Sequence, residues 1–231
     1  MTPHSVSRET FGELTSAQEL QIERVLRTLE ADEHAPTAIR EPQHAAHAHI
    51  ADSLAALTLD PLRKARTIAD LGSGAGFPGV ALAVALPQAA VSLVESQRRK
   101  CEFLHRLCSA AGLENARVVC ARAEEWGEGV SSNDVVTARA LAPQPVVLEY
   151  AAPLLRIGGT LIDWRGRRSP EQEQAADRAA STLGLRRMEV RRVTPFAGAR
   201  DHYLHVFVKA QETPAGFPRR PGVARKRPLG G

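Results

Sequence analysis

Residues 67–79 read Thr-Ile-Ala-Asp-Leu-Gly-Ser-Gly-Ala-Gly-Phe-Pro-Gly, which is the pattern of a buried strand followed by a glycine-rich turn and a helix start. Gly72, Gly74 and Gly76 can adopt positive φ, and because glycine has no Cβ a ligand can lie against the backbone of the turn. Pro78 suits the first turn of the helix, where its missing N–H is not needed. The segment therefore predicts a nucleotide-binding α/β sheet.

Two acidic residues near this turn favour one cofactor over another. Asp70 precedes the glycines, where a carboxylate would repel a diphosphate but suit the cationic amino-acid end of S-adenosylmethionine (SAM). Glu95 ends the next predicted strand, residues 90–95, and could accept both ribose hydroxyls of an adenosine, a role that fits NAD equally well. The pair favours SAM. An NAD-linked oxidoreductase, or a strand–turn–helix without a ligand, remains as an alternative.

The length of 231 residues allows one sizeable α/β domain with an appended segment. No stretch approaches the roughly 18 apolar residues of a membrane span, and residues 1–9 lack the apolar run of a signal peptide, so a cytoplasmic protein is expected. Cys101 and Cys108 are too far apart along a helix to bridge, and Cys120 is left over. Neither a disulfide framework nor a zinc site is expected.

Helical segments precede a region in which strands and helices alternate. Residues 16–19 fit a capping box that opens an amphipathic helix reaching about Ala31, and residues 43–59 form a second helix. From Thr67 the alternation predicts a parallel sheet with helices on both faces. The further predicted elements are helices at 98–111 and 145–155 and strands at 117–120, 134–138 and 160–164.

The last part of the predicted domain departs from this alternation. Residues 186–193 and 202–209 are strand-like with no helix between them, so they predict an antiparallel hairpin. A mostly parallel sheet that ends in such a hairpin is the Rossmann-like class I arrangement of SAM-dependent methyltransferases. We expect a helical extension over residues 1–66, a SAM-binding domain over 67–210 and a mobile basic tail over 211–231.

Positive charge is concentrated at the carboxyl-terminal end. The chain has a net charge of +4, yet residues 186–231 hold eleven Arg or Lys against three acidic residues. A basic end on a near-neutral or acidic body is typical of proteins that contact phosphates.

Five motifs are typical of one known family, and the second and fifth of them are more specific than the glycines alone. They are His49-Ile50-Ala51-Asp52-Ser53-Leu54, the turn with its extension Phe77-Pro78-Gly79, Arg122-Ala123-Glu124-Glu125, Ala138-Arg139-Ala140 and the tail Phe217-Pro218-Arg219-Arg220-Pro221-Gly222. With them the chain resembles the ribosomal RNA small subunit methyltransferase G family (RsmG, also called GidB) from about residue 14 to 229. The resemblance implies methylation of guanine N7 in 16S rRNA with SAM as cofactor, and the small ribosomal subunit or its precursor as partner.

The resemblance also implies roles for individual residues. Gly72 and Phe77 would line the SAM site, and Ala123 and Glu124 would meet the adenine, although Glu124 fits a helix start almost as well. The full expected cofactor set is Asp70, Gly72, Gly74, Phe77, Glu95, Ala123, Glu124 and Arg139. The residues expected to hold the RNA backbone are Arg165, Arg167, Arg168, Arg219, Arg220, Arg225, Lys226 and Arg227.

Four residues are candidates for direct involvement in the reaction: His49, Ser53, Arg139 and Arg165. His49, with Asp52 and Ser53, is expected to border the substrate pocket, but a helix-face histidine bonded to a neighbour fits His49 equally well. Arg165 stands where the resembled family has lysine, which keeps the charge but changes the hydrogen-bond geometry. The spacing of His44, His47 and His49 gives no i, i+4 pair, so no metal is expected.

The implied reaction needs little acid–base chemistry. Guanine N7 has an in-plane lone pair and no proton, so its attack on a methyl group needs no general base and depends on positioning. A monomeric enzyme is expected. A non-enzymatic protein that binds ribosomes and keeps SAM without turnover remains an alternative. Trp126 and Trp164 are expected to pack in the core, with Trp164 beside Arg165 the better candidate for stacking on a base.

Overall fold

Seven strands form one sheet in a computed structural model that describes residues 14–39 and 41–230. The sheet order is β3-β2-β1-β4-β5-β7-β6. The strands are β1 (Thr67–Leu71), β2 (Ala90–Glu95), β3 (Ala116–Cys120), β4 (Asn133–Arg139), β5 (Leu155–Arg165), β6 (Leu185–Arg192) and β7 (Tyr203–Lys209). Strands β1 to β5 pair in parallel, and β7 runs antiparallel to both β5 and β6. The predicted parallel sheet with a terminal hairpin is confirmed.

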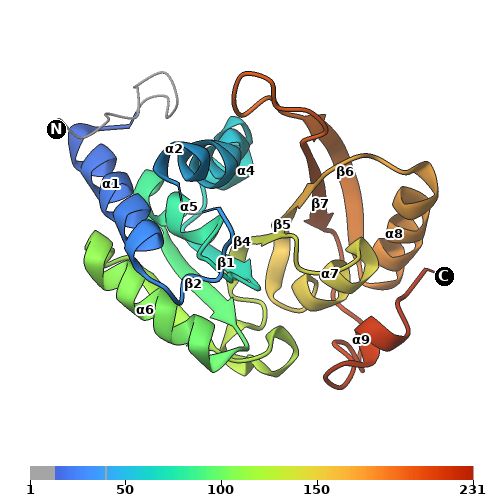
Figure 1. The fold of residues 1–231 in the computed structure, drawn as a ribbon. Helices are drawn as coiled ribbons and strands as arrows, with labels where there is room; N and C mark the ends of the chain where they lie inside the picture. The colour runs from blue at the N-terminus through green and yellow to red at the C-terminus, as the bar shows by residue number, and fades with distance from the viewer. Residues whose placement is uncertain (1–13, 40, 231) are drawn as a thin grey trace, which may run out of the picture.

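Helices cover both faces of the sheet (Figure 1). One face carries α1 (Ser16–Ala31), α5 (Gly79–Ala85) and α6 (Arg98–Ala111), and the other carries α7 (Gln144–Ala151) and α8 (Pro170–Thr182). Because side chains alternate across a strand, β1 serves two cores. Ile68 packs in the first hydrophobic cluster, whereas Ala69 and Leu71 pack in the second.

The order of the strands fixes where a ligand can bind. From β1 the chain continues outward through β2 and β3, and β4 then returns to the other side of β1. Crossover helices therefore leave β1 and β4 in opposite directions, and a crevice forms at the carboxyl ends of these two strands. The glycine turn follows β1, so it lies at this crevice.

The segment before the sheet is helical but irregular. The cap of α1 is Thr15 rather than Ser16, because its side chain accepts from Gln18 N while the Gln18 side chain accepts from Thr15 N. The single helix predicted at 43–59 is a series of short pieces: α2 (Pro42–Ala45), a π-helix η2 (Ala46–Ala51), α3 (Asp52–Leu54), a 3-10 helix η3 (Ala55–Thr58) and α4 (Asp60–Arg63). Single π turns are frequent at functional sites.

Two elements near the carboxyl-terminal half differ from the prediction. Helix α8 was not expected; Ser169 caps it, Pro170 starts it, and it buries alanines such as Ala176 and Ala179 instead of large apolar residues. Strand β5 begins at Leu155 and runs through the glycine pair at 158–159, where its register against β4 shifts. Helix α7 therefore ends at Ala151, four residues before the predicted end at residue 155. Two 3-10 turns, η4 (Ala123–Glu125) and η5 (Gly127–Gly129), precede β4.

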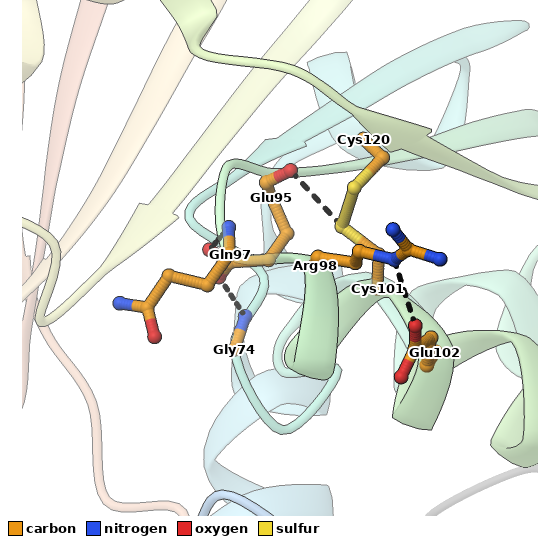
Figure 2. The surroundings of a disulfide bond; sticks show 7 residues. All are labelled: Gly74, Glu95, Gln97, Arg98, Cys101, Glu102 and Cys120. Atoms are coloured by element: carbon orange, nitrogen blue, oxygen red, sulfur yellow. Dashed lines mark hydrogen bonds and ion pairs between the residues drawn. A yellow bond between two sulfur atoms is a disulfide. The ribbon is translucent and has the colours of Figure 1, made fainter.

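Cys101 and Cys120 form a disulfide, so the expectation that no disulfide is present is wrong. The register of β2 and β3 pairs Glu95 with Cys120, and helix α6 begins just beyond the end of β2. Cys101 in the first turn of α6 therefore lies over the end of β3, next to Glu95 (Figure 2). Cys108 is free and buried.

The basic tail is packed against the domain, contrary to the expectation that it is mobile. It carries α9 (Val223–Lys226), which buries Ala224 in the second cluster beyond α7 (Figure 1). Phe217 and Leu229 pack against the same cluster. The tail has no hydrophobic core of its own, but its apolar side chains pack into the second hydrophobic cluster of the domain.

The described residues contain no helix long and apolar enough to cross a membrane. They also contain no cluster of three or more His, Cys, Asp or Glu side chains arranged to hold a metal ion. Residues 1–9, where no signal peptide is expected, lie outside the described part of the chain.

Candidate active site

The glycine turn has the backbone conformation that its sequence predicts. Gly72, Gly74 and Gly76 have φ of +66°, +54° and +100°, in or near the left-handed region that side chains other than glycine rarely adopt. A Cβ added at Gly72 would lie 2.5 Å from Leu141 Cδ1. The turn therefore needs glycine both for its φ angles and for its close approach to the segment that follows β4.

Asp70 supports the turn from within the protein. Its side chain is fully buried; Oδ2 accepts from Gly79 N at 3.2 Å and Oδ1 accepts from the Thr137 hydroxyl at 2.9 Å. Burial raises the pKa of this carboxyl to about 6, against hydrogen bonds that lower it. The carboxylate thus joins β1, β4 and the start of α5. This differs from the prediction that Asp70 meets the cofactor directly.

Glu95 lies beside the glycine turn, at the end of β2 (Figure 2). Its Oε2 accepts from Gly74 N at 3.1 Å and its Oε1 accepts from Gln97 N at 2.8 Å. The side chain is 5% exposed. A carboxylate held by two backbone amides at the carboxyl edge of the sheet has a fixed position, as a ribose-binding acid requires.

A small pocket adjoins Gly72 on the side of α7. Gly72, Ala123 and Glu124 line it together with Tyr150 and Arg225. Its volume is about 60 Å³, well below the roughly 300–1,000 Å³ of pockets that bind cofactor-sized ligands. The residues predicted to meet the adenine therefore share one pocket with Gly72, and a ligand of that size can enter only if its lining moves.

The tail forms one wall of this pocket. Gly222 N donates to Glu124 Oε1 at 3.4 Å, and Arg225 Nη2 donates to Leu141 O at 3.1 Å. Burial and the negative charge of Glu124 raise the pKa of the Tyr150 hydroxyl. The Glu124 side chain thus contacts the tail. Neither predicted role, contact with the adenine or stabilisation of a helix start, included this contact.

A buried ion pair holds the tail in place. Glu149 in α7 accepts from Arg219 N at 3.0 Å, from Arg219 Nε at 2.9 Å and from Arg219 Nη2 at 2.5 Å. The Glu149 side chain is 1% exposed. Arg219 therefore anchors the tail to α7, and its expected contact with RNA remains a prediction.

Arg139 ends β4 and is held by the π-helix. Its Nη1 donates to Ala48 O at 3.0 Å and to Asp52 Oδ2 at 2.8 Å. The guanidinium also lies over the Phe77 ring, 5.8 Å from the centroid. Ala140 has φ of +54°, uncommon for a residue with a Cβ, so the chain turns sharply directly after Arg139. The side chain is fixed between the helical extension and the glycine turn.

His49 is buried between Arg139 and Phe77. Its Nδ1 accepts from Arg139 Nη2 at 3.2 Å, which leaves Nε2–H to donate to the Thr37 hydroxyl at 3.1 Å. Its ring stacks on Phe77 with centroids 4.8 Å apart and planes at 6°. Burial, followed by the nearby Arg139 charge, lowers the pKa of His49 to about 4. His49 is therefore neutral, and it borders the turn through Phe77.

Ser53 does not face a pocket. It is fully buried and its hydroxyl donates to His49 O, one helical turn earlier, at 2.5 Å. The neighbouring Asp52 instead connects three elements: it accepts from Arg139, its Oδ1 accepts from His202 Nδ1 at 2.8 Å, and its backbone O accepts from Trp164 Nε1 at 3.0 Å. Ser53 thus lies inside the protein, and its expected position at the substrate pocket remains a prediction. Asp52, expected beside it, connects β4, β5 and the loop before β7.

A sequence model of the family described as GidB, rRNA small subunit methyltransferase G, matches residues 23–200. The chain belongs to this family. A ribosomal RNA small subunit methyltransferase G of Rubrobacter xylanophilus is 38% identical over 198 residues, which cover 83% of this chain and 76% of that protein. That of Syntrophomonas wolfei is 42% identical over 184 residues, covering 78% and 85%.

Solved structures show the same fold at lower identity. A predicted O-methyltransferase from Agrobacterium tumefaciens has a TM-score of 0.55 and 25% identity, covering 70% of this chain and 81% of its own. Aeropyrum pernix fibrillarin with natively bound S-adenosyl-L-methionine has a TM-score of 0.54 and 22% identity, covering 68% and 73%. The predicted class I methyltransferase fold is confirmed.

In this RsmG-family chain the residues predicted to bind RNA differ in two respects: whether an acidic side chain already pairs with them, and whether they are exposed to solvent. Arg165 Nε donates to Asp163 Oδ2 at 2.6 Å, and burial raises the pKa of Asp163 to about 6. Arg168 donates twice to Glu173. Arg167, by contrast, has an 87% exposed side chain whose nearest acid, Asp201, lies 3.9 Å from its Nε. The exposed members of the set are Arg167, Arg168, Arg220, Arg225, Lys226 and Arg227.

Sequence reasoning missed three residues in or near this region. Tyr150 lines the pocket, His202 donates to Asp52, and the Phe196 ring contacts that of His202. Tyr150 lies inside the apolar run of α7, where an aromatic residue is usually core. Phe196 and His202 lie in the loop between β6 and β7, which was interpreted as a plain connection. A large aromatic residue among the small and polar residues of a loop was the available signal. Both tryptophans are buried in the hydrophobic clusters.

Proposed function

We propose that this protein transfers a methyl group from SAM to N7 of a guanine in the rRNA of the small ribosomal subunit. The observation that carries the proposal is the site itself. In a chain of the RsmG family, the glycine turn, Glu95 and Arg139 meet at the switch point of the sheet beside a pocket that includes Ala123 and Glu124. We further propose that the enzyme acts as a monomer in the cytoplasm.

The residues at the turn fit the cofactor. Gly72 lines the same pocket as Ala123 and Glu124, and Glu95 is an acid in a fixed position at the end of β2. When bound, SAM supplies an electrophilic methyl group on a sulfonium. The residues that would hold it are Gly72, Gly74, Phe77, Glu95, Ala123, Glu124 and Arg139.

The protein groups near Arg139 favour a reaction without a general base. His49 is neutral and has both ring nitrogens in hydrogen bonds, so it is not available to remove a proton. Asp52 offsets the charge of Arg139, so little net positive charge opposes the cation that forms on the guanine ring. The contribution of these residues is to position the reactants and exclude water.

Replacing Glu95 by alanine should weaken SAM binding by about 1–3 kcal/mol, the scale of lost hydrogen bonds to a charged group. The variant should remain folded, because Gly74 N and Gln97 N lie near the crevice where water can replace the carboxylate. Calorimetric titration with SAM measures the effect. Glu125→Ala, an exposed acid in η4, is the control. Unchanged affinity in a folded Glu95→Ala protein would remove Glu95 from the site.

We propose that exposed basic side chains of the tail and the β5–α8 loop hold the RNA backbone. Replacing Arg220, Lys226 and Arg227 together by alanine should weaken RNA binding and lower its salt dependence by about 0.7–0.9 in slope for each lost phosphate contact. SAM affinity should not change, because none of the three lines the pocket. Filter binding at several salt concentrations measures the slope. An unchanged slope would place the RNA on another surface.

Both earlier alternatives make different predictions. The antiparallel hairpin and the family membership favour SAM over NAD. A protein that keeps SAM without turnover would bind the cofactor but transfer nothing. The deciding test is incubation of the purified protein with methyl-labelled SAM and undermethylated small subunits or 16S rRNA, followed by mapping of the labelled base. Label at guanine N7 supports the proposal, whereas SAM binding without transfer would contradict it.

A further inference from the structure

The loop between β6 and β7 places an aromatic side chain against the π-helix that also holds Arg139. The ring of Phe196 stacks on that of His47 in the π-helix, with centroids 5.3 Å apart and planes at 21°. It also meets the ring of His202 edge-on, with centroids 5.8 Å apart and planes at 76°. His47, Phe196 and His202 form a continuous aromatic group, here called the loop platform, and each of the three is partly exposed.

Phe196 has no role in either hydrophobic core. Of the phenylalanines in the described residues, it alone lies outside both clusters. Its neighbours Ala197 and Gly198 are small and exposed. A large ring kept partly in water costs hydrophobic free energy that a polar residue would not. Such a residue in a loop is therefore explained more readily by a binding role than by packing.

The loop platform is connected to the site through Asp52. His202 Nδ1 donates to Asp52 Oδ1 at 2.8 Å, and Asp52 Oδ2 accepts from Arg139 Nη1 at 2.8 Å. Arg139 in turn covers Phe77 of the glycine turn. His202 directly precedes β7, whose first residue pairs with the last residue of β5, so the loop platform lies at the carboxyl edge of the parallel strands, where ligands bind in such sheets.

Two arginines lie in or next to the loop that carries Phe196 and His202. Arg200 is exposed in the same loop, and Arg167 reaches across from the β5–α8 loop to within 3.9 Å of Asp201. An unpaired nucleotide could therefore place its phosphates on these arginines while its base lies on the aromatic rings. Proteins bind single-stranded RNA with this combination of a basic groove and stacking side chains.

On this basis we propose that Phe196 is the stacking surface for the target guanine. The inference rests on the proposed function and specifies how its substrate is held. Stacking holds a base by its face, so the edge that carries N7 stays free to attack the methyl group. The ring becomes cationic as the N7–methyl bond forms and the sulfonium loses its charge. A cation over an aromatic face is favoured, so Phe196 would stabilise the transition state more than the neutral guanine.

The test compares four variants: Phe196→Ala, Phe196→Leu, Phe196→Tyr and, as a matched control, Met188→Ala, an exposed apolar residue of the same hairpin. For each, kcat/KM for methylation of small-subunit rRNA and the Kd for SAM are measured. Phe196→Ala and Phe196→Leu should lower kcat/KM by about 5- to 150-fold. Phe196→Tyr and Met188→Ala should stay within about threefold of the unmodified protein. SAM affinity should be unchanged throughout.

The leucine variant separates stacking from packing, because it keeps an apolar side chain but removes the ring. Full activity of Phe196→Leu in a protein whose unmodified form is active would overturn this inference and leave the proposed function intact. Loss of SAM affinity in Phe196→Ala would also overturn it, since the ring would then support the cofactor site. An unmodified protein that binds SAM but methylates no rRNA would overturn the proposed function, and this inference with it.

Discussion

Replacing Arg219 by alanine should lower the free energy of unfolding by about 3–5 kcal/mol, the cost of leaving a buried charge without its partner. Glu149 is 1% exposed and accepts from the backbone N, Nε and Nη2 of Arg219. The backbone donor alone cannot offset a buried carboxylate. The same change frees the tail, so the wall that Arg225 forms beside Glu124 should loosen as well.

Denaturant unfolding monitored by circular dichroism measures this effect. Arg220→Ala, the neighbouring exposed arginine, is the matched control and should change stability by no more than about 0.5 kcal/mol. The double variant Arg219→Ala with Glu149→Gln should recover part of the loss, because a neutral amide costs less to bury than a carboxylate. Equal stability of the Arg219 and Arg220 variants would show that the tail is not anchored by this pair.

Replacing Arg139 by lysine should lower kcat/KM for rRNA methylation by about 100-fold, which corresponds to roughly 3 kcal/mol and to the loss of one or two charge-assisted hydrogen bonds. Lysine keeps a positive charge beside the buried Asp52, so the fold should survive. A single ammonium cannot reproduce the planar fork that contacts Ala48 O, Asp52 and His49 together. The charge would therefore shift relative to Phe77.

Steady-state kinetics with small-subunit rRNA measures the loss, and thermal unfolding confirms that the variant is folded. Arg99→Lys, a change at an exposed arginine in α6, is the control. Near-normal kinetics of Arg139→Lys would mean that the site needs the charge of Arg139 and not its hydrogen-bond geometry.

Local sequence patterns predicted the elements that depend on neighbours along the chain. The glycine turn follows from Gly72, Gly74 and Gly76, and α6 was predicted with its observed bounds because its apolar period is regular and Gly112 ends it in the left-handed conformation. The terminal hairpin was predicted because two strand-like segments follow each other with no helix between them. Helix α8 was missed because it buries alanines, which give a weak apolar period.

Contacts between residues far apart in sequence could not be predicted in this way. The disulfide depends on the register that places Cys120 opposite Glu95. The anchored tail depends on Glu149, an acid inside an apolar helix, 70 residues before its partner Arg219. Asp70 was assigned to the ligand because it borders the turn, but whether its carboxylate faces outward or toward Gly79 is decided by packing.

If this RsmG-family chain methylates guanine N7 in small-subunit rRNA, deleting its gene must change the methylation of 16S rRNA. Mass spectrometry of 16S rRNA from cells that make the protein, and from cells in which its gene is deleted, tests this most directly. One N7-methylguanosine should be lost on deletion, restored by the unmodified protein and not restored by Arg139→Ala. Identical methylation of 16S rRNA in both kinds of cell would contradict it.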